Sequence, residues 1–321
     1  MNFRWLLAAS IAVALSFPIA ASGQGQVTKI RASTIPSTDN GAFESARAKG
    51  FFAQQGLEVD TTPVAGGAFG IPALMAGQIQ IASSNIVSII LAASQGLDIV
   101  IVGAGDATGA NAPDLAGLVA KKGATIRSGK DLENKRIAVN ARNNILWLYA
   151  REWVAKTGGD PDKVTFVEVP FPQIIDAVRN DRVDAAMLVE PFLSSSIKAN
   201  ILDAVAWPYH AVRSGIPVAQ FVTTREYAQK NPQIIESFIR GHNLGVDWVA
   251  ANKQSDEFFK IVSGYTKVSP ESLRGTTIPV FVKTIDPAQL DFTIGLMKKH
   301  RLIKEARPGR ELLHPKLLPA Q

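Results

Sequence analysis

The residue types that most often perform catalysis are few and scattered along this chain. Its four histidines, His210, His242, His300 and His314, do not have the spacing of metal ligands. Cysteine is absent, which excludes disulfides, thiolate metal sites, iron–sulfur clusters and cysteine nucleophiles. The chain has no Gly-x-Ser-x-Gly segment and no identifiable base for a serine triad. We therefore expect no metal centre, and we interpret His300 and His314 as solvated side chains near the C-terminus.

Two glycine segments match phosphate-binding motifs only in part. Gly103 to Gly109 follows a strand, but its last glycine spacing is one residue too long, and Asn111 to Pro113 follows where a helix is needed. Gly129-Lys130 lacks the earlier glycine and the Ser or Thr of a P-loop. We therefore expect no cofactor.

Polar segments between strands and helices are more informative. They are Ser37 to Asn40, Gly66-Gly67, Ser83 to Asn85, Asn140 to Asn144, and Leu188 to Glu190. Ligands of open α/β sheets lie beyond the carboxyl ends of the strands, where free N–H groups of helix starts suit a carboxylate, sulfonate or phosphate. Each segment also has a simpler interpretation as a helix cap or a turn.

Two charged residues in these segments have open roles. Arg142 could pair with an anion or could be a solvated residue at a helix start. Glu190 could accept a hydrogen bond from a ligand or could hold a hinge together. Helix starts, side-chain amides and Arg142 together favour a small organic anion such as a sulfonate or carboxylate. Nearby aromatic residues could stack on a ligand ring or belong to the core: Phe43, Phe69, Trp147, Phe171 and Phe192.

Short β-type runs alternate with helical stretches from Lys29 onward, which predicts an α/β fold with mainly parallel sheets. The first half contains predicted strands at 30–33, 57–60, 79–82 and 98–102, and predicted helices over 42–55 and 69–76. The second half contains predicted strands at 136–139, 164–167 and 183–186, and predicted helices over 145–156 and 173–178. Gly56 follows the first helix at the position of a left-handed cap.

The two halves repeat one another in register. Ala73-Leu74 corresponds to Ala177-Val178, and Ala82 corresponds to Ala186, so that each pair is 104 residues apart (177 − 73 and 186 − 82). A helix, a turn and a strand share this register. We infer two similar lobes, each with a small α/β sheet.

Two extended runs, 114–121 and 218–223, are candidates for strands that cross between the lobes and form a hinge. Lobe 2 is then an insertion in lobe 1, with residues 27–116 and 218–321 in lobe 1 and residues 117–217 in lobe 2. Predicted helices over 231–252, 255–265 and 286–300 return to lobe 1, and the proline-rich end, 307–319, is interpreted as a surface tail.

The N-terminus has the layout of a cleaved secretory signal. A basic start is followed by the apolar run Trp5 to Phe17 and by the small residues Ala20 to Ser22. We expect a signal peptide over residues 1–22 and a soluble exported chain; the alternative, a retained anchor, lacks a stop-transfer length and flanking basic residues. The net charge of +6 is scattered, which argues against nucleic-acid binding.

Several segments in this order and spacing resemble the periplasmic substrate-binding proteins of bacterial ABC importers, specifically the nitrate/sulfonate/taurine group, which also includes binders of thiamine pyrimidine precursors. The segments are Ala48 to Phe52 with Gly56 to Val59; Leu74 to Ala82, with Gln80 where Asp is usual; Asp131 to Val139, with Asn134 replacing the common Gly; and Val183 to Ala186 with Glu190-Pro191. The resemblance covers about Lys29 to Ile303.

This resemblance implies a two-lobed, type II periplasmic-binding-protein fold that closes around one ligand and delivers it to an ABC permease with its ATPase. It carries a ligand-binding role onto Ser37, Thr38, Asp39, Gly67, Ser83, Ser84, Asn85, Asn140, Arg142, Asn143 and Glu190. We expect a monomer without a lipid anchor, because lipidation needs an N-terminal cysteine. The alternatives are an exported enzyme using Glu190 or Asp39 as acid or base, and a sensor domain for a membrane receptor.

Overall fold

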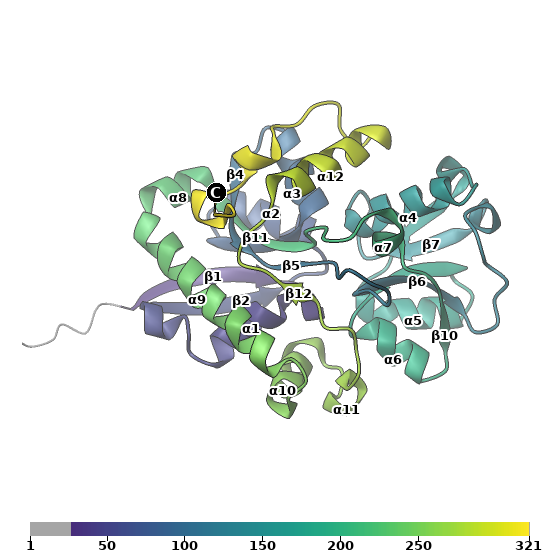
Figure 1. Ribbon diagram of the computed structural model, residues 1–321, viewed down its shortest axis with the longest axis horizontal. Coiled ribbons are helices and arrows are strands. Elements are labelled where there is room, and N and C mark those ends of the chain that lie inside the picture. Colours follow the sequence, from purple (N-terminus) through teal and green to yellow (C-terminus); the bar gives the residue numbers. More distant parts are fainter. Residues whose placement is uncertain (1–26, 321) are drawn as a thin grey trace, which may run out of the picture.

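The structure, a computed structural model, describes residues 27–320 and contains two five-stranded sheets, each flanked by helices (Figure 1). We call each sheet with its helices a lobe. The signal peptide expected over residues 1–22 lies outside the described residues. Across residues 27–320, no helix combines the length and the apolar character that a membrane crossing requires.

The sheet of the first lobe has the order β2-β1-β3-β11-β4. Its strands are β1 (Thr28–Thr34), β2 (Leu57–Pro63), β3 (Ile81–Asn85), β4 (Ile99–Ala104) and β11 (Ala219–Thr224). β1 is parallel to β2 and β3, whereas β11 is antiparallel to both β3 and β4. Four strands therefore point the same way. β4 is a continuous apolar run because helices and loops bury both of its faces.

The sheet of the second lobe repeats this arrangement in the order β8-β7-β9-β6-β10. Its strands are β6 (Ala116–Lys121), β7 (Arg136–Val139), β8 (Thr165–Glu168), β9 (Ala185–Val189) and β10 (Leu202–Ala206). Again the three neighbours β8, β7 and β9 are parallel, and β6 is antiparallel to β9 and β10. The strand order and directions match those of the first lobe one by one, as the 104-residue register predicted.

The helices lie on both faces of the sheets. They are α1 (Gly41–Ala48), α2 (Gly67–Met75), α3 (Ile86–Ser94), α4 (Ile145–Lys156), α5 (Phe171–Arg179), α6 (Phe192–Lys198), α7 (Pro208–Val212), α8 (Arg225–Lys230), α9 (Pro232–Asn252), α10 (Asp256–Thr266), α11 (Pro270–Leu273) and α12 (Pro287–Lys299). The helix predicted over 42–55 is shorter, because Gly50 has a φ of 72° and interrupts it. Gly56 has a φ of 74°, the left-handed conformation expected of it.

The two runs predicted to cross between the lobes lie instead inside the sheets, as β6 in the second lobe and β11 in the first. The chain crosses just before each of them, between β4 and β6 and between α7 and β11. In the first crossing, β5 (Asp106–Ala107) pairs with β12 (Val280–Phe281) of the C-terminal segment (Figure 1). Backbone pairing thus connects the crossing to a third stretch of chain.

The C-terminal helices return to the first lobe, where the long α9 packs on α1 (Figure 1). The proline-rich end is not the surface tail that its composition suggested. Leu312, Leu313 and Leu317 are buried, and the His314 N–H donates to the Ile101 carbonyl at 2.9 Å. The leucines between the prolines supply an apolar face that covers β4, the edge strand of its sheet.

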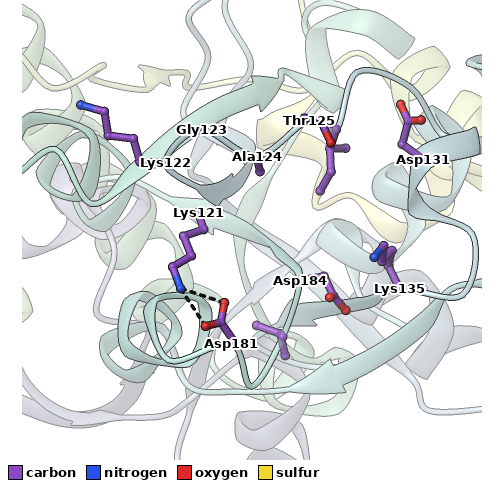
Figure 2. A pocket seen from close by; sticks show the side chains of 11 residues that line it. Lys121, Lys122, Gly123, Ala124, Thr125, Asp131, Lys135, Asp181 and Asp184 are labelled. Atoms are coloured by element: carbon purple, nitrogen blue, oxygen red, sulfur yellow. Dashed lines mark hydrogen bonds and ion pairs between the residues drawn. The ribbon is translucent and has the colours of Figure 1, made fainter.

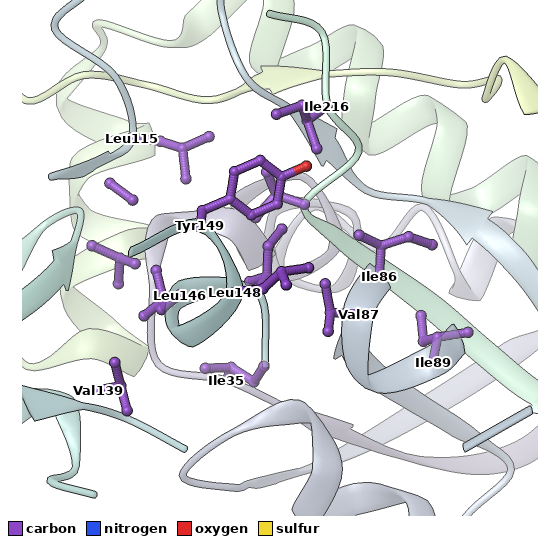
Figure 3. Close-up of a cluster of buried hydrophobic side chains, with 14 of the residues drawn as sticks. Ile35, Ile86, Val87, Ile89, Leu115, Val139, Leu146, Leu148, Tyr149 and Ile216 are labelled. Atoms are coloured by element: carbon purple, nitrogen blue, oxygen red, sulfur yellow. The ribbon is translucent and has the colours of Figure 1, made fainter. Parts of the chain in front are cut away.

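The apolar core runs from one lobe into the other without interruption. Figure 3 shows Ile86, Val87 and Ile89 of α3 beside Leu146 and Tyr149 of α4, so that helices of the two lobes meet directly. The described arrangement is therefore one in which the lobes are closed on each other.

Candidate functional site

A cavity of about 30 Å³ lies between the lobes. We call it the interlobe cavity; it is lined by Ile35, Asp39, Asn85, Asn140, Asn144, Ile145, Leu146, Phe171, Val189, Tyr209, Val218 and Ala219. Asn85 and Val189 end strands β3 and β9, and Asn140 directly follows β7. The cavity therefore lies at the carboxyl ends of the strands of both sheets, where α/β proteins bind ligands.

Asp39 is the charged side chain of the cavity wall. It lies in a short 3₁₀ turn, Thr38–Asn40, that follows β1. The Ser37 hydroxyl donates to Asp39 Oδ2 at 2.8 Å, whereas Oδ1 has no hydrogen-bond partner. Burial raises the pKa of Asp39 to about 6, although the hydrogen bond from Ser37 opposes this rise.

Two further buried carboxyl groups lie close to Asp39. Asp106 accepts a hydrogen bond from the Ala219 N–H at 2.8 Å, and burial together with the neighbouring Asp39 raises its pKa well above the usual value. A hydrogen bond between the two carboxyl groups lowers the pKa of Asp39 and raises that of Asp106. Asp114 accepts from the Leu115 N–H at 2.8 Å, and burial raises its pKa to about 6. Three carboxyl groups thus gather at the crossing.

Three asparagines, Asn85, Asn140 and Asn144, form an amide cluster on the cavity wall. Asn85 caps α3, because its Oδ1 accepts from the Ser88 N–H at 3.0 Å, and Asn144 caps α4 by accepting from the Trp147 N–H at 3.1 Å. Asn144 also donates to Asn140 Oδ1 at 2.8 Å. Asn85 and Asn144 therefore cap helices, as expected of such residues, and also line the cavity.

The predicted site residues join the two lobes directly. The Thr38 N–H donates to the Glu190 carbonyl at 3.0 Å, and the Thr38 hydroxyl donates to the same oxygen at 3.2 Å. The Ile145 N–H donates to Asn85 Oδ1 at 3.2 Å, and Asn140 Nδ2 donates to the Ala65 carbonyl. Lobe closure is thus stabilised by contacts within the chain itself.

The carboxylate of Glu190 is held by protein groups. Its oxygens accept from the Ser194 hydroxyl at 2.6 Å, the Ser194 N–H at 3.1 Å and the Thr277 N–H at 3.1 Å. Burial raises its pKa. The sequence left two roles open for Glu190, holding a hinge together or binding a ligand. These contacts favour the hinge role.

Two aromatic rings complete the cavity wall. Tyr209 of α7 is fully buried, packs edge-on against Tyr149 at 5.0 Å, and has a hydroxyl without a hydrogen-bond partner. Phe171 begins α5 and stacks on Phe192 at 6.2 Å. The cavity therefore combines polar groups with apolar ring surface.

Ser83, Ser84 and Gly67 are beside this cavity rather than on its wall. Ser83 and Ser84 belong to β3, not to a loop, and both are fully buried with unpartnered hydroxyls. Gly67 begins α2 and packs so closely that an added Cβ would lie 2.3 Å from Ser84 Oγ. This close approach needs a glycine and lets α2 cover the strand end.

Arg142 and Asn143 lie outside the interlobe cavity. They line a separate groove of about 210 Å³ together with residues of α2 and α3. The Arg142 N–H donates to the exposed Glu168, and Asn143 has a φ of 58° in a turn. Both side chains are exposed.

The other candidate aromatic residues have separate places. Phe43 stacks on Phe221 at 4.8 Å within the core, Trp147 lies under the Arg151 guanidinium at 4.8 Å, and Phe69 is 53% exposed. Of these five candidates Phe171 alone lines the interlobe cavity, and Phe192 stacks behind it.

A larger and more open hollow, of about 470 Å³, lies on the second lobe alone (Figure 2). Figure 2 shows Lys121 bonded to both carboxylate oxygens of Asp181, with Lys135, Asp131 and Asp184 around it. Lysines and aspartates balance there, and lobe closure does not form it. We therefore place the candidate site in the interlobe cavity.

The histidines form no site together. His242 is buried with Nε2 2.7 Å from the Ala104 carbonyl, and burial lowers its pKa to about 4. His300 is not solvated, contrary to its interpretation above: it is 5% exposed and contacts Glu152 at 2.8 Å, because the end of α12 folds onto α4. Over residues 27–320, no cluster of three or more His, Asp or Glu side chains has an arrangement suited to a metal ion.

The fold is that of the two-lobed periplasmic binding proteins. The alkanesulfonate-binding protein SsuA from Xanthomonas axonopodis pv. citri, bound to MOPS, superimposes with a TM-score of 0.75 at 15% identity, over 89% of this chain and 98% of that chain. The periplasmic nitrate-binding protein NrtA from Synechocystis PCC 6803 gives a TM-score of 0.75 at 14% identity, over 89% and 84%. A ligand-binding component of an ABC-type import system from Staphylococcus aureus gives 0.76 at 16%, over 90% and 97%.

The family is defined by sequence. The chain belongs to the NMT1/THI5 like family, whose model matches residues 38–255. Curated proteins contain no significant match to it. The matched span includes every residue of the interlobe cavity except Ile35. The resemblance to substrate-binding proteins of ABC importers is thus confirmed at the level of family and fold.

Proposed function

We propose that this chain is the solute-binding component of an ABC import system and that it captures a small molecule in the interlobe cavity. The observation that carries the proposal is the convergence of Asp39 and Asn85 from the first lobe with Asn140 and Asn144 from the second on one small cavity. Groups from both lobes can hold one ligand only when the lobes are together, so binding favours closure.

We also propose that the lobes, residues 27–116 with 218–321 and residues 117–217, move as units about the crossing segments. A cavity of about 30 Å³ holds about two water-sized molecules. A larger solute therefore enters when the lobes are apart and is held when they approach. The hydrogen bonds between Thr38 and Glu190 keep the hinge side joined.

The proposed setting is the periplasm, reached after removal of residues 1–22. The chain would act there as a monomer without a lipid anchor and present its closed lobes to an ABC permease with its ATPase. The N-terminal sequence pattern supports this setting, as do the neighbours, which are described as periplasmic and import proteins.

The expected ligand class changes. A small organic anion was expected in part because of Arg142, but that side chain lies in the groove beside α2 and α3. Among the described residues that line the interlobe cavity, none is Lys or Arg, and Asp39 is acidic. A negative wall disfavours an anion. We therefore propose a small organic solute that is not an anion.

Lobe movement gives a direct test, because the chain contains no cysteine and two introduced cysteines can be labelled cleanly. Gln54→Cys and Gln173→Cys place labels on exposed positions, one in each lobe. A bound solute should shift the distance distribution between the labels towards one value, measured by energy transfer, and should be recovered chemically unchanged.

A matched control pair, Gln54→Cys with Lys260→Cys, lies within the first lobe and should keep a constant distance. Consumption of the solute would favour the exported enzyme instead. A distance that responds to none of the solutes tested would argue against solute binding.

A further inference from the structure

Three buried carboxyl groups lie at or near the interlobe cavity, and among the described residues of its wall none is Lys or Arg. Asp39 lines the cavity, and Asp106 shares a hydrogen bond with it. One oxygen of each carboxyl group, Asp39 Oδ1 and Asp106 Oδ2, has no other protein partner. Asp114 is also buried. A buried carboxylate without a partner is costly unless something else binds it.

An independent observation indicates that a ligand fills this position. Tyr209 lines the cavity, and its hydroxyl is buried and has no hydrogen-bond partner. Tyr209 also lies within the electrostatic influence of all three aspartates. Buried polar groups are nearly always satisfied, so an unpartnered hydroxyl beside unpartnered carboxyl oxygens points to a missing donor.

The other residues of the cavity wall indicate what kind of molecule carries the missing hydrogen-bond donor. The rings of Tyr209 and Phe171 face the same space, and Ile35, Ile145 and Leu146 add apolar surface. An aromatic face attracts a cation, and a carboxylate pairs with one. Carboxylates next to aromatic rings therefore suit an ammonium or amidinium group on a small apolar body.

We propose, on the basis of the proposed solute-binding function, that the solute is a small organic cation whose ammonium or amidinium group binds the Asp39–Asp106 carboxyl pair. The Tyr209 hydroxyl then accepts a further N–H, and the asparagine cluster orients the rest of the molecule. A metal cation does not fit this arrangement, because no group of three ligating side chains surrounds the position in the described chain.

The test is a thermal-shift and calorimetric screen of the full exported chain with probes matched in shape and different in charge. The cations are putrescine, agmatine and benzylamine; the neutral counterparts are 1,4-butanediol and benzyl alcohol; the anions are nitrate, ethanesulfonate, succinate and benzoate. At least one cation, at about 100 times its Kd, should raise Tm by several degrees, while its counterparts do not.

Variants then locate the binding group. Asp106→Asn should weaken binding of that cation by about 10- to 100-fold, because a hydrogen bond to a charged group is lost. Asp39→Asn should do the same, and both variants should fold, since an amide oxygen can accept from Ala219 or Ser37 as the carboxylate does. The control Asp203→Asn removes an exposed carboxylate on β10 and should leave affinity unchanged.

The outcomes separate the two proposals. Binding of an anion without binding of any cation would overturn the cation proposal and leave solute binding intact. Cation binding that survives both Asp39→Asn and Asp106→Asn in folded protein would also overturn it. A screen in which no probe of any charge binds would count against both.

Discussion

Asp39 occupies an unfavourable place in the folded chain. Its carboxyl group is buried beside Asp106, and its pKa rises from 3.8 to about 6. The folded state therefore holds this proton more tightly than the unfolded state does. The contribution to stability is greatest below about pH 4, falls as the pH rises to about 6, and then stays low.

Asp39→Asn should raise stability near pH 7 by about 1–3 kcal/mol, because the buried charge is removed and the amide can donate to Asp106. Near pH 4 the gain should almost vanish. Urea unfolding of both proteins between pH 4 and pH 8 measures this difference. A variant that is less stable than the parent at pH 7 would contradict it.

The sequence predicts part of the site for a physical reason. Asn85 and Asn140 directly follow or end strands of the repeat, so local pattern was enough to find them, and Asn144 lay in the same predicted loop. Asp106, Asp114 and Tyr209 were not found, because they come close to Asp39 only when the crossing segments and α7 come together. Asp106 lies inside the segment Gly103 to Gly109 that was compared with phosphate-binding motifs, and nothing local marks it as a binding group.

At the scale of elements, α4 and α12 connect the lobes away from the hinge. Glu152 of α4 accepts from Lys299 at 2.7 Å and from His300 at 2.8 Å, both at the end of α12. Burial opposes ionisation of Glu152, yet these partners lower its pKa overall. This interlobe ion pair stabilises the closed arrangement.

Glu152→Gln should weaken closure by about 1–2 kcal/mol, because the charge that pairs with Lys299 is lost. The label pair at positions 54 and 173 should then report a larger open fraction at a given solute concentration. Glu226→Gln is the control, since it removes an exposed pair with Lys230 within α8 and should change little. An unchanged open fraction in Glu152→Gln would contradict the role of this pair.

The positions of helices and strands were predictable where a local sequence pattern defines them. They were less predictable where a segment packs against a partner that is distant in sequence. The strands and the helix starts follow from apolar runs and capping residues. The buried C-terminal leucines and His300 were misjudged because their partners, β4 and α4, are far away in sequence. Polar or proline-rich composition does not reveal such docking.

At the scale of the whole molecule, the two lobes have the same sheet topology. The strands of the second lobe come from one continuous stretch of chain, whereas those of the first lobe come from two stretches. Every strand of the second lobe lies within residues 116–206, whereas the first lobe needs β11 between β3 and β4. The 104-residue register therefore predicted the similarity of the lobes, and the positions of the two antiparallel strands account for the insertion.

A fragment of residues 114–217 should fold alone, with a cooperative thermal transition in circular dichroism, because its sheet is complete. A fragment of residues 27–113 should not, because β3 and β4 lack the strand that joins them. Cooperative unfolding of the shorter, N-terminal fragment would contradict this expectation.

The second lobe is built from one continuous stretch of chain, and this affects the order in which the two lobes can fold. A chain that emerges N-terminus first, as during synthesis, can complete the second lobe while β3 and β4 still wait for β11, α9 and the leucines after residue 311. In the first lobe, β3 and β4 are therefore the strands whose shared neighbour, β11, emerges late. Unpaired strand edges are the surfaces on which chains aggregate, so a chain that is still emerging is exposed to misassembly chiefly at its first lobe.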